Sequence, residues 1–134
     1  MTQDLEYLAY TSVLTALLWV PYIAGRTIAT GMPTPAAYRD PTPPAMPAWV
    51  KRCDRAHLNA VESLVPFAAL VLVAHAAGLS GESTAFWAGT FFFARVAHAV
   101  VFWLGIPYLR TLTFAVGLVA TLAIFWIVIA APAA

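Results

Sequence analysis

The sequence predicts an all-α integral membrane protein, a bundle of four transmembrane helices that forms a single domain over residues 1–134. Hydrophobic residues make up 62% of the chain and charged residues only 10%, and the mean hydropathy is +0.81. A soluble domain is roughly half apolar and about a quarter charged. Four apolar stretches each provide the roughly 20 residues that cross the hydrocarbon core of a bilayer. Composition and segment length therefore both indicate a membrane protein.

The first predicted span covers about residues 5–28, which are mostly apolar. Pro21 is expected to kink this helix, because proline has no N–H to donate, and membrane helices tolerate the change when neighbours satisfy the freed carbonyl. A secretory signal peptide is not expected. Its first residues should be basic, whereas this chain begins with Asp4 and Glu6 and no lysine or arginine.

A proline-rich segment follows over about residues 30–47 and contains six prolines. Proline at this density breaks helices and favours extended backbone. The sequence therefore predicts one substantial loop here. It leaves open whether this loop is ordered against the bundle or partly mobile.

Three further helices are predicted over about residues 49–77, 82–104 and 108–130. Glycines within residues 78–81 predict a short turn between the first two of these helices. The sequence Gly-Ile-Pro at 105–107 is expected to separate the last two, because proline and glycine both interrupt a helical pattern. No internal repeat is present.

The basic residues predict the orientation in the membrane. Six of them lie in or beside the first or the third helix connection: Arg26, Arg39, Lys51, Arg52, Arg55 and Arg110. The N-terminus, the turn at 78–81 and the C-terminus contain none. By the positive-inside rule, both basic connections, including the proline-rich loop, lie in the cytoplasm and both termini lie outside.

Several classes of function are not supported by the sequence. The net charge of +1 provides no clustered basic surface, so no nucleic-acid partner is expected. Cys53 is the only cysteine, which excludes an intrachain disulfide. Metal binding by His98 and Glu62 has no supporting ligand spacing, so no metal is predicted. No P-loop, GxSxG or HExxH motif is present.

The most informative residues are polar ones inside the second predicted helix. Arg52, Arg55, Asn59 and Glu62 are spaced by three, four and three residues, which at about 100° per residue places them within an arc of roughly 80°. Glu62 lies near mid-membrane, where a lone charge costs at least about 2.5–3.5 kcal/mol. It is therefore expected to face the bundle interior and to have a partner.

Arg95, in the third helix, is the predicted partner of Glu62. It lies mid-helix, with His98 one turn on and Phe102 on the same face. Two opposite charges at comparable depth on antiparallel neighbouring helices favour an ion pair. The pair either belongs to a functional site or only fixes the register of the two helices, and the sequence favours neither reading.

Arg55, Asn59 and His98 lie nearer the cytoplasmic end and exceed what one structural ion pair needs. They predict a polar pocket open to the cytoplasm rather than contacts that only hold helices together. Arg52 fits either this pocket or a solvated position at the membrane surface. His57 faces away from the polar side of its helix and is expected to contact lipid headgroups or another subunit. Cys53 has no general base beside it, so a nucleophilic role is not expected.

The segment 55–67, RAHLNAVESLVPF, resembles the helix 2 signature of the membrane-associated proteins in eicosanoid and glutathione metabolism, the MAPEG family. The shared features are the pattern Arg-Ala-x-x-Asn-x-x-Glu and the Pro-Phe that follows. The family includes microsomal glutathione transferases, prostaglandin E synthase and leukotriene synthase. Arg95-x-x-His98 and Arg110-Thr111 support the resemblance, which covers nearly the whole chain and suggests a bacterial member.

The resemblance implies a homotrimer of four-helix bundles, surrounded by the lipids of a bacterial inner membrane, with both termini in the periplasm. Glutathione, as co-substrate, would bind between subunits near the cytoplasmic face. The second helix would line the central contacts, where small and polar residues allow close approach. The residues expected there are Ala56, Asn59, Ala60 and Ser63.

The resemblance also implies which residues form the site. Glutathione would be held by Arg26, Arg52, Arg55, Asn59, Glu62, Arg95 and His98. Arg26 looks like the basic residue that a neighbouring subunit contributes. Arg110 and Thr111 are the implied catalytic residues, the first stabilising the thiolate and the second offering a hydroxyl donor. Phe102 stands where family enzymes often have tyrosine, which keeps a stacking surface but removes a hydrogen-bond donor.

The leading hypothesis is a glutathione-dependent transferase or peroxidase that acts on lipophilic electrophiles or lipid hydroperoxides. A thiol with a pKa of about 8.5 is mostly protonated at neutral pH, and a nearby guanidinium favours the reactive thiolate. Two alternatives stay open. One is a non-enzymatic membrane protein that binds a lipid headgroup or another anion through the same arginines. The other is a structural or partner-binding membrane subunit.

Overall fold

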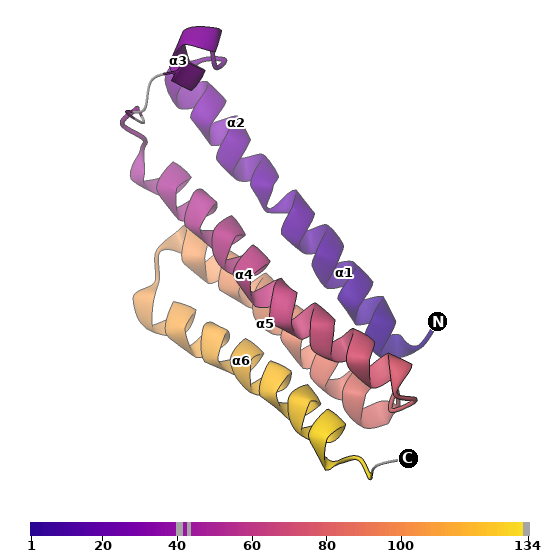
Figure 1. Cartoon of the computed structure of the whole chain (residues 1–134). Coiled ribbons are helices and arrows are strands. Elements are labelled where there is room, and N and C mark those ends of the chain that lie inside the picture. Colours follow the sequence, from indigo (N-terminus) through magenta and orange to yellow (C-terminus); the bar gives the residue numbers. More distant parts are fainter. Residues whose placement is uncertain (40–41, 43, 133–134) are drawn as a thin grey trace.

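The chain is all-helical in a computed structural model, which describes residues 1–39, 42 and 44–132. The helices of this part are α1 (Gln3–Leu17), α2 (Trp19–Thr30), α3 (Pro35–Arg39), α4 (Ala48–Ala76), α5 (Glu82–Leu104) and α6 (Pro107–Ala130) (Figure 1). Four stretches of the described chain are long and apolar enough to cross a membrane, namely α1 with α2, then α4, α5 and α6. This confirms the predicted all-α class with four long apolar helices.

Two parts of the chain covered by the sequence predictions lie outside the described residues. Asp40, Pro41 and Pro43 belong to the predicted proline-rich loop, and residues 133–134 close the predicted domain. The sequence predicted no helix in this loop, but the short helix α3 forms within it. Pro35 is the first residue of α3, a position where the missing N–H has no helical partner to lose.

The first span is interrupted at Leu18, between α1 and α2. Pro21 explains the interruption, because it cannot donate the hydrogen bond that the carbonyl of Leu17 would accept in a continuous helix. The sequence predicted a kink from this proline. The structure places the break one turn before it.

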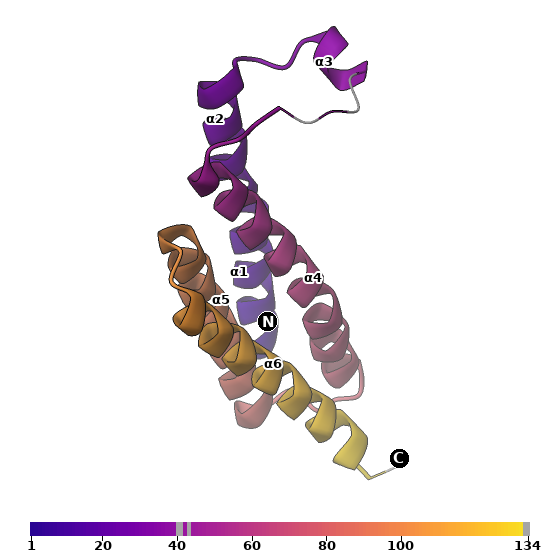
Figure 2. The same cartoon turned by 90° about the vertical axis from the view of Figure 1, so that its left-hand side faces the viewer.

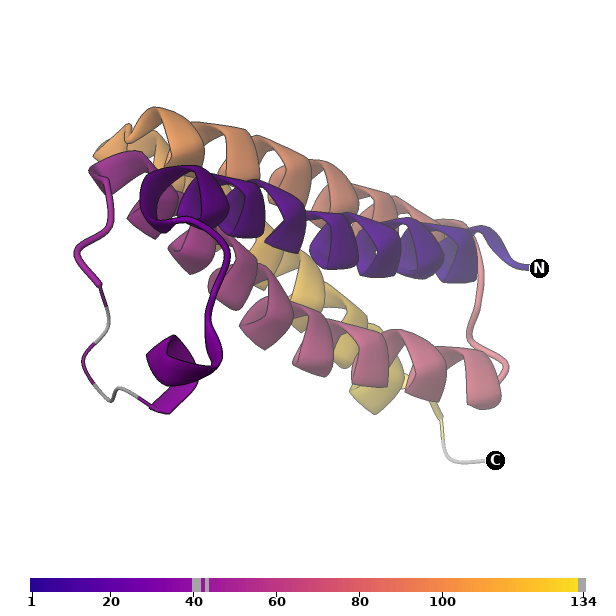
Figure 3. The ribbon, with the colours of Figure 1, turned by 90° about the horizontal axis from the view of Figure 1, so that it is seen from above.

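The helices form an antiparallel bundle in which α5 contacts α1, α4 and α6. Helices α1 and α6 lie on opposite sides, with α4 and α5 between them (Figures 1 and 3). The N-terminus, the α4–α5 turn and the end of α6 gather at one end, which we call the outer end (Figure 1). The α2–α4 and α5–α6 connections lie toward the other end, and α3 stands apart from the bundle there (Figure 2).

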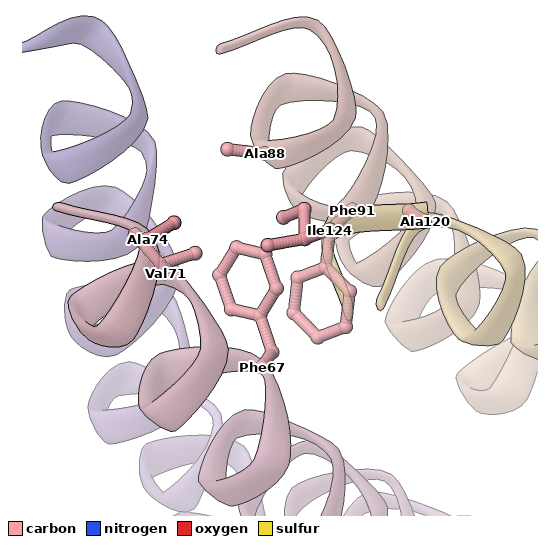
Figure 4. Packing of buried hydrophobic residues seen from close by; sticks show 7 residues of the cluster. All are labelled: Phe67, Val71, Ala74, Ala88, Phe91, Ala120 and Ile124. Atoms are coloured by element: carbon pink, nitrogen blue, oxygen red, sulfur yellow. The ribbon is translucent and has the colours of Figure 1, made fainter. Parts of the chain in front are cut away.

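The largest apolar core lies in the outer half of the bundle and joins α4, α5 and α6 (Figure 4). The rings of Phe67 and Phe91 stack with centroids 3.8 Å apart and planes 5° apart. Small side chains around these rings let the helices approach closely. The cluster consists of Phe67, Val71, Ala74, Ala88, Phe91, Ala120 and Ile124.

A buried polar contact closes the outer end. The side chain of Asp4, in the first turn of α1, is only 1% exposed. The hydroxyl of Ser80, in the α4–α5 turn, donates a 2.7 Å hydrogen bond to Asp4 Oδ2. The same hydroxyl lies 3.1 Å from His75 Nδ1 at the end of α4. A buried carboxylate needs such partners. The three residues therefore hold the start of α1 against the α4–α5 turn.

Candidate functional site

A polar pocket of about 330 Å³ opens between α4, α5 and α6, on the side of the bundle away from the apolar core. Its walls mix charged, polar and aromatic side chains. They are Arg55, Leu58, Asn59, Glu62, His98, Phe102, Arg110, Thr111 and Phe114. Six of the nine predicted site residues meet here: Arg55, Asn59, Glu62, His98, Arg110 and Thr111.

The end of α5 explains why α5 and α6 meet at this pocket. Gly105 has a φ of 76°, in the left-handed region where glycine is favoured. Its N–H and that of Ile106 both donate to the carbonyl of Val101, at 3.0 and 3.2 Å. Pro107 then begins α6 at once, so α6 folds back along α5 and brings Arg110 beside His98.

His98 is buried at 4% exposure and is fixed by α6. Its Nδ1 lies 3.1 Å from the carbonyl oxygen of Arg110 and 3.1 Å from Thr113 Oγ1. A carbonyl only accepts hydrogen bonds, so Nδ1 is the protonated nitrogen. Nε2 is buried and has no hydrogen-bond partner among the residues that the structure describes. In the neutral ring, Nε2 is therefore a buried acceptor without a hydrogen bond among the described residues.

Arg110 and Phe102 form the aromatic side of the pocket. The guanidinium carbon of Arg110 lies 5.0 Å from the centre of the Phe102 ring. Phe102 in turn packs edge-on against His98, with ring centroids 5.5 Å apart. The side chain of Arg110 is exposed, and only its backbone carbonyl contacts His98. Thr111 Oγ1 donates to the carbonyl of Pro107 at 3.3 Å.

The predicted ion pair between Glu62 and Arg95 is wrong. Arg95 is 3% exposed, and its Nη1 donates to Asn59 Oδ1 at 3.2 Å and to Ser63 Oγ at 2.9 Å. Its Nη2 reaches the carbonyls of Thr113 and Phe114 on α6, both at 3.4 Å. Neutral acceptors on two helices thus replace the expected carboxylate.

Glu62 keeps its carboxylate free as a result. Its side chain is exposed, and it lines the pocket from the α4 side together with Arg55. Within the described part of the chain, neither residue takes part in a hydrogen bond or an ion pair. The charges that face the pocket are therefore two guanidinium groups, of Arg55 and Arg110, and one carboxylate.

Arg26 and Arg52 do not line this pocket. The Nε of Arg52 donates to the carbonyl of Trp103 at 3.0 Å, so Arg52 satisfies a carbonyl at the end of α5. The sequence offered two positions for Arg52, the polar pocket or a solvated site at the membrane surface, and neither included this contact. Arg26 lies half-buried near the end of α2.

The structure adds to one expectation about the surface of α4 and corrects another. His57 is half-buried and contacts α1, which was not expected, because its Nδ1 lies 3.2 Å from the carbonyl oxygen of Thr15. Ala56 and Ala60, expected at central trimer contacts, are buried inside the single chain at 1% and 6% exposure. The other two residues expected there, Asn59 and Ser63, bind Arg95. The large hydrophobic residues that α4 exposes are Trp49, Leu58, Val61, Val65, Leu72 and Val73.

Sequence reasoning missed three residues of this region, Thr113, Phe114 and Gly117, and assigned a fourth, Ser63, to trimer contacts instead. Ser63 lies one turn after Asn59, on the face already identified, so its spacing was a usable signal. Phe114 likewise follows Arg110 by one turn. Gly117 gave a weaker signal, as one small residue in a bulky apolar helix. A Cβ atom on Gly117 would overlap with Nη2 of Arg95, so the glycine makes room for the guanidinium.

The chain matches one known protein family over most of its length. A model of the MAPEG family matches residues 7–130, nearly the whole chain. The match covers all of the pocket residues. No curated protein sequence matches the chain at a significant level.

Proposed function

Because the chain belongs to the MAPEG family, whose members are glutathione transferases, peroxidases or related proteins, we propose that it binds glutathione in the α4–α6 pocket and activates its thiol. The thiolate then attacks a lipophilic electrophile that arrives from the bilayer. The observation that carries this proposal is the set of charges facing the pocket. They come from two different helices, and their side chains make no hydrogen bond or ion pair among the described residues.

The charges of glutathione complement those of the pocket. Glutathione carries two carboxylates and one ammonium group, and its activation adds a thiolate. Glu62 is proposed to bind the ammonium group, and Arg55 and Arg110 to bind anionic groups. Arg26 of a neighbouring subunit would supply a third guanidinium. With it, three positive side chains face two carboxylates and one thiolate.

Arg110 is proposed to stabilise the thiolate. A guanidinium close to a thiol favours the ionised form, which is the nucleophile. In the described part of the chain the Arg110 side chain packs on the Phe102 ring and makes no hydrogen bond or ion pair, so it is available to a ligand. Thr111 Oγ1 is proposed to orient the peptide by a hydrogen bond, because Thr111 lines the pocket. The buried ring of His98 forms part of the wall beside it.

A titration of purified protein with glutathione tests the proposal. Calorimetry should detect binding, and the near-ultraviolet absorbance of a thiolate should appear in proportion to the bound ligand. An analogue with a methyl group in place of the thiol should bind without that absorbance. No binding and no thiolate signal at millimolar glutathione would contradict the proposal. Phospholipid that copurifies with such a protein would then favour the lipid-headgroup alternative.

Arg55→Ala is expected to weaken glutathione binding more than it slows the chemical step. Arg55 faces the pocket from α4, whereas the proposed thiolate contact is on α6. A charged hydrogen bond is worth about 1.5–3 kcal/mol, which corresponds to a rise in Kd of roughly 10- to 150-fold. Steady-state kinetics should show a raised KM for glutathione with a nearly unchanged kcat. A fall in kcat at saturating glutathione would place Arg55 at the reacting sulfur instead.

We propose that the protein assembles as a homotrimer. Arg55 and Glu62 are charged, exposed side chains on a membrane-spanning helix, and lipid is a costly surrounding for unpaired charges. A second copy would cover this face and bring Arg26 to the pocket. Native mass spectrometry in mild detergent is expected to show a trimer that dissociates only in harsh detergent. A monomer alone in several mild detergents would contradict the assembly.

The proposed topology places both termini outside and residues 30–47 in the cytoplasm. Arg39→Cys should react with a membrane-impermeant maleimide only after the cells are opened. Ser83→Cys, in the first turn of α5 at the outer end, should react in intact cells. The native Cys53 is buried, so the background is expected to be low. Labelling of Arg39→Cys in intact cells would contradict this topology and indicate the opposite orientation in the membrane.

A further inference from the structure

A groove with a volume of about 600 Å³ runs along the outer half of α5, and we call it the α5 groove. Its floor consists of α5 residues between Glu82 and Ala94, while Gln3 and Tyr7 line it from α1 and Val116 lines it from α6. In the described part of the chain α1 and α6 do not contact each other, so α5 is open between them. The groove shares no residue with the polar pocket and is therefore a separate site.

The aromatic wall of the α5 groove is held in place before any ligand binds. The ring of Tyr7 lies directly on α5 at Gly89, where an added Cβ would come within 3.0 Å of the ring. Its centroid lies 6.1 Å from that of Phe92 and 6.2 Å from that of Phe93. Phe86 and Phe93 line the groove and are still 64% and 61% exposed. A wall that is already ordered lowers the entropic cost of binding an apolar chain.

The polarity of the α5 groove changes along its length. Gln3 and Glu82 lie at its outer mouth with exposed side chains, which make no hydrogen bond or ion pair among the described residues. The hydroxyl of Tyr7 likewise has no hydrogen bond there. Farther along, the hydroxyl of Thr90 donates to the carbonyl of Phe86 at 2.9 Å, so it is satisfied within α5. The free polar groups therefore lie toward the mouth, and the deep end is apolar.

The length of the α5 groove matches one leaflet of a bilayer. From Glu82 to Ala94 the groove follows α5 for about 18 Å, at 1.5 Å per residue. A bilayer with its headgroups is about 40–45 Å thick, so one leaflet measures roughly 20–22 Å. Glu82 begins α5 and Ala94 lies near the middle of this helix. The groove thus runs from the level of the headgroups to near the centre of the membrane.

The charges of the outer end favour one kind of headgroup. The N-terminus, the α4–α5 turn and the C-terminus contain no lysine or arginine. Asp4 is buried and accepts from Ser80, which leaves Glu6 and Glu82 as the acidic side chains that face outward. These carboxylates repel an anionic headgroup and attract an ammonium group. A second copy of the chain would bring the same acidic side chains to this end, so it complements the mouth less well than such a lipid does.

We propose that the α5 groove binds one phospholipid of the leaflet at the outer end, with a net-neutral headgroup that carries an ammonium group. An acyl chain lies along α5 against the aromatic wall. Glu82 accepts hydrogen bonds from the ammonium group. The amide of Gln3 donates to the phosphate, and the hydroxyl of Tyr7 donates to an ester carbonyl. This inference requires only that the four helices cross a membrane, and it does not depend on glutathione.

Native mass spectrometry of the delipidated protein tests the headgroup. The protein is titrated with phosphatidylethanolamine and with phosphatidylglycerol of identical chains. The first should bind about two- to fivefold more tightly, the range that an exposed ion pair provides. Glu82→Gln should bring this ratio close to one. Glu6→Gln is the matched control, because Glu6 is acidic and lies at the same end but does not line the groove, so this variant should keep most of the preference.

A second pair of variants tests the location. Thr90→Trp places an indole halfway along the α5 groove and should remove the first, tightest-bound lipid. Ala97→Trp is its control, because Ala97 is exposed on the same side of α5 two turns farther on and lines neither the groove nor the polar pocket. It should bind lipid as the unchanged protein does. Millimolar glutathione should not displace the lipid from either the unchanged protein or this control.

Several results would overturn the proposal. Equal affinities of the unchanged protein for the two lipids would show that Glu82 does not select the headgroup. Equal lipid binding by Thr90→Trp and Ala97→Trp would exclude the groove as the site. A changed oligomeric mass in Thr90→Trp alone would mark the groove as a contact between copies of the chain. Displacement of the lipid by glutathione would place it in the polar pocket instead. None of these results bears on whether glutathione itself binds.

Discussion

Arg110→Ala is expected to lower the rate of glutathione conjugation about 100-fold, the usual loss when one group that stabilises a developing anion is removed. The thiolate absorbance of bound glutathione should disappear at neutral pH. The fold should persist, because the Arg110 side chain is exposed and His98 is held by the backbone carbonyl of residue 110, which the substitution keeps. Stopped-flow absorbance and thermal unfolding measure the two effects separately.

Two variants control for this result. Lys51→Ala removes an exposed positive charge near the same end of the bundle without touching the pocket, so it should leave the thiolate signal intact. Arg110→Lys keeps the charge but loses the planar fork of the guanidinium, so it should retain part of the signal. A thiolate signal in Arg110→Ala equal to that of Lys51→Ala would assign the activation to another group.

Gly117→Ala is expected to destabilise the protein by about 1–3 kcal/mol, the usual range for overpacking a close helix contact. The new Cβ would overlap with Nη2 of Arg95. This nitrogen ends a flexible side chain, so the cost depends on the hydrogen bonds that it must give up. Those are its bonds to the α6 carbonyls of Thr113 and Phe114.

A double-mutant cycle identifies Arg95 as the cause. Alanine normally favours a helix over glycine by about 1 kcal/mol, so Gly117→Ala should stabilise the protein once Arg95→Ala has removed the guanidinium. The sign of the effect therefore reverses between the two backgrounds. Unfolding in detergent by heat or denaturant measures it. The same destabilisation in both backgrounds would show that Gly117 serves helix packing independently of Arg95.

The fold followed from features that act along the chain. In a bilayer every backbone polar group must be bonded within the segment, so long apolar stretches become helices whatever their neighbours are. Glycines at 78–81 and the Gly-Ile-Pro of 105–107 interrupt those stretches and limit the choice of turns. The short helix α3 was missed because a proline that breaks a helix also begins one well.

Most of the candidate site was also predictable, because its residues repeat at helical spacing on single helices. Arg55, Asn59 and Glu62 share one face of α4 by their spacing alone, and the structure keeps them together in one pocket. Helical spacing, however, gives only the direction of a side chain around its own axis. It does not give the distance to the next helix or the residue that lies opposite.

The partner of Arg95 was therefore decided by tertiary structure. The sequence by itself established that a buried arginine at this depth needs acceptors, and Glu62 was the nearest charge by depth. Gly117 lets the guanidinium lie against α6, where carbonyls of Thr113 and Phe114 are within reach, while Asn59 and Ser63 approach from α4. Hydrogen bonding depends on sub-ångström approach between helices far apart in the sequence, and no periodicity along one helix encodes it. The consequence is that Glu62 remains free to face the pocket.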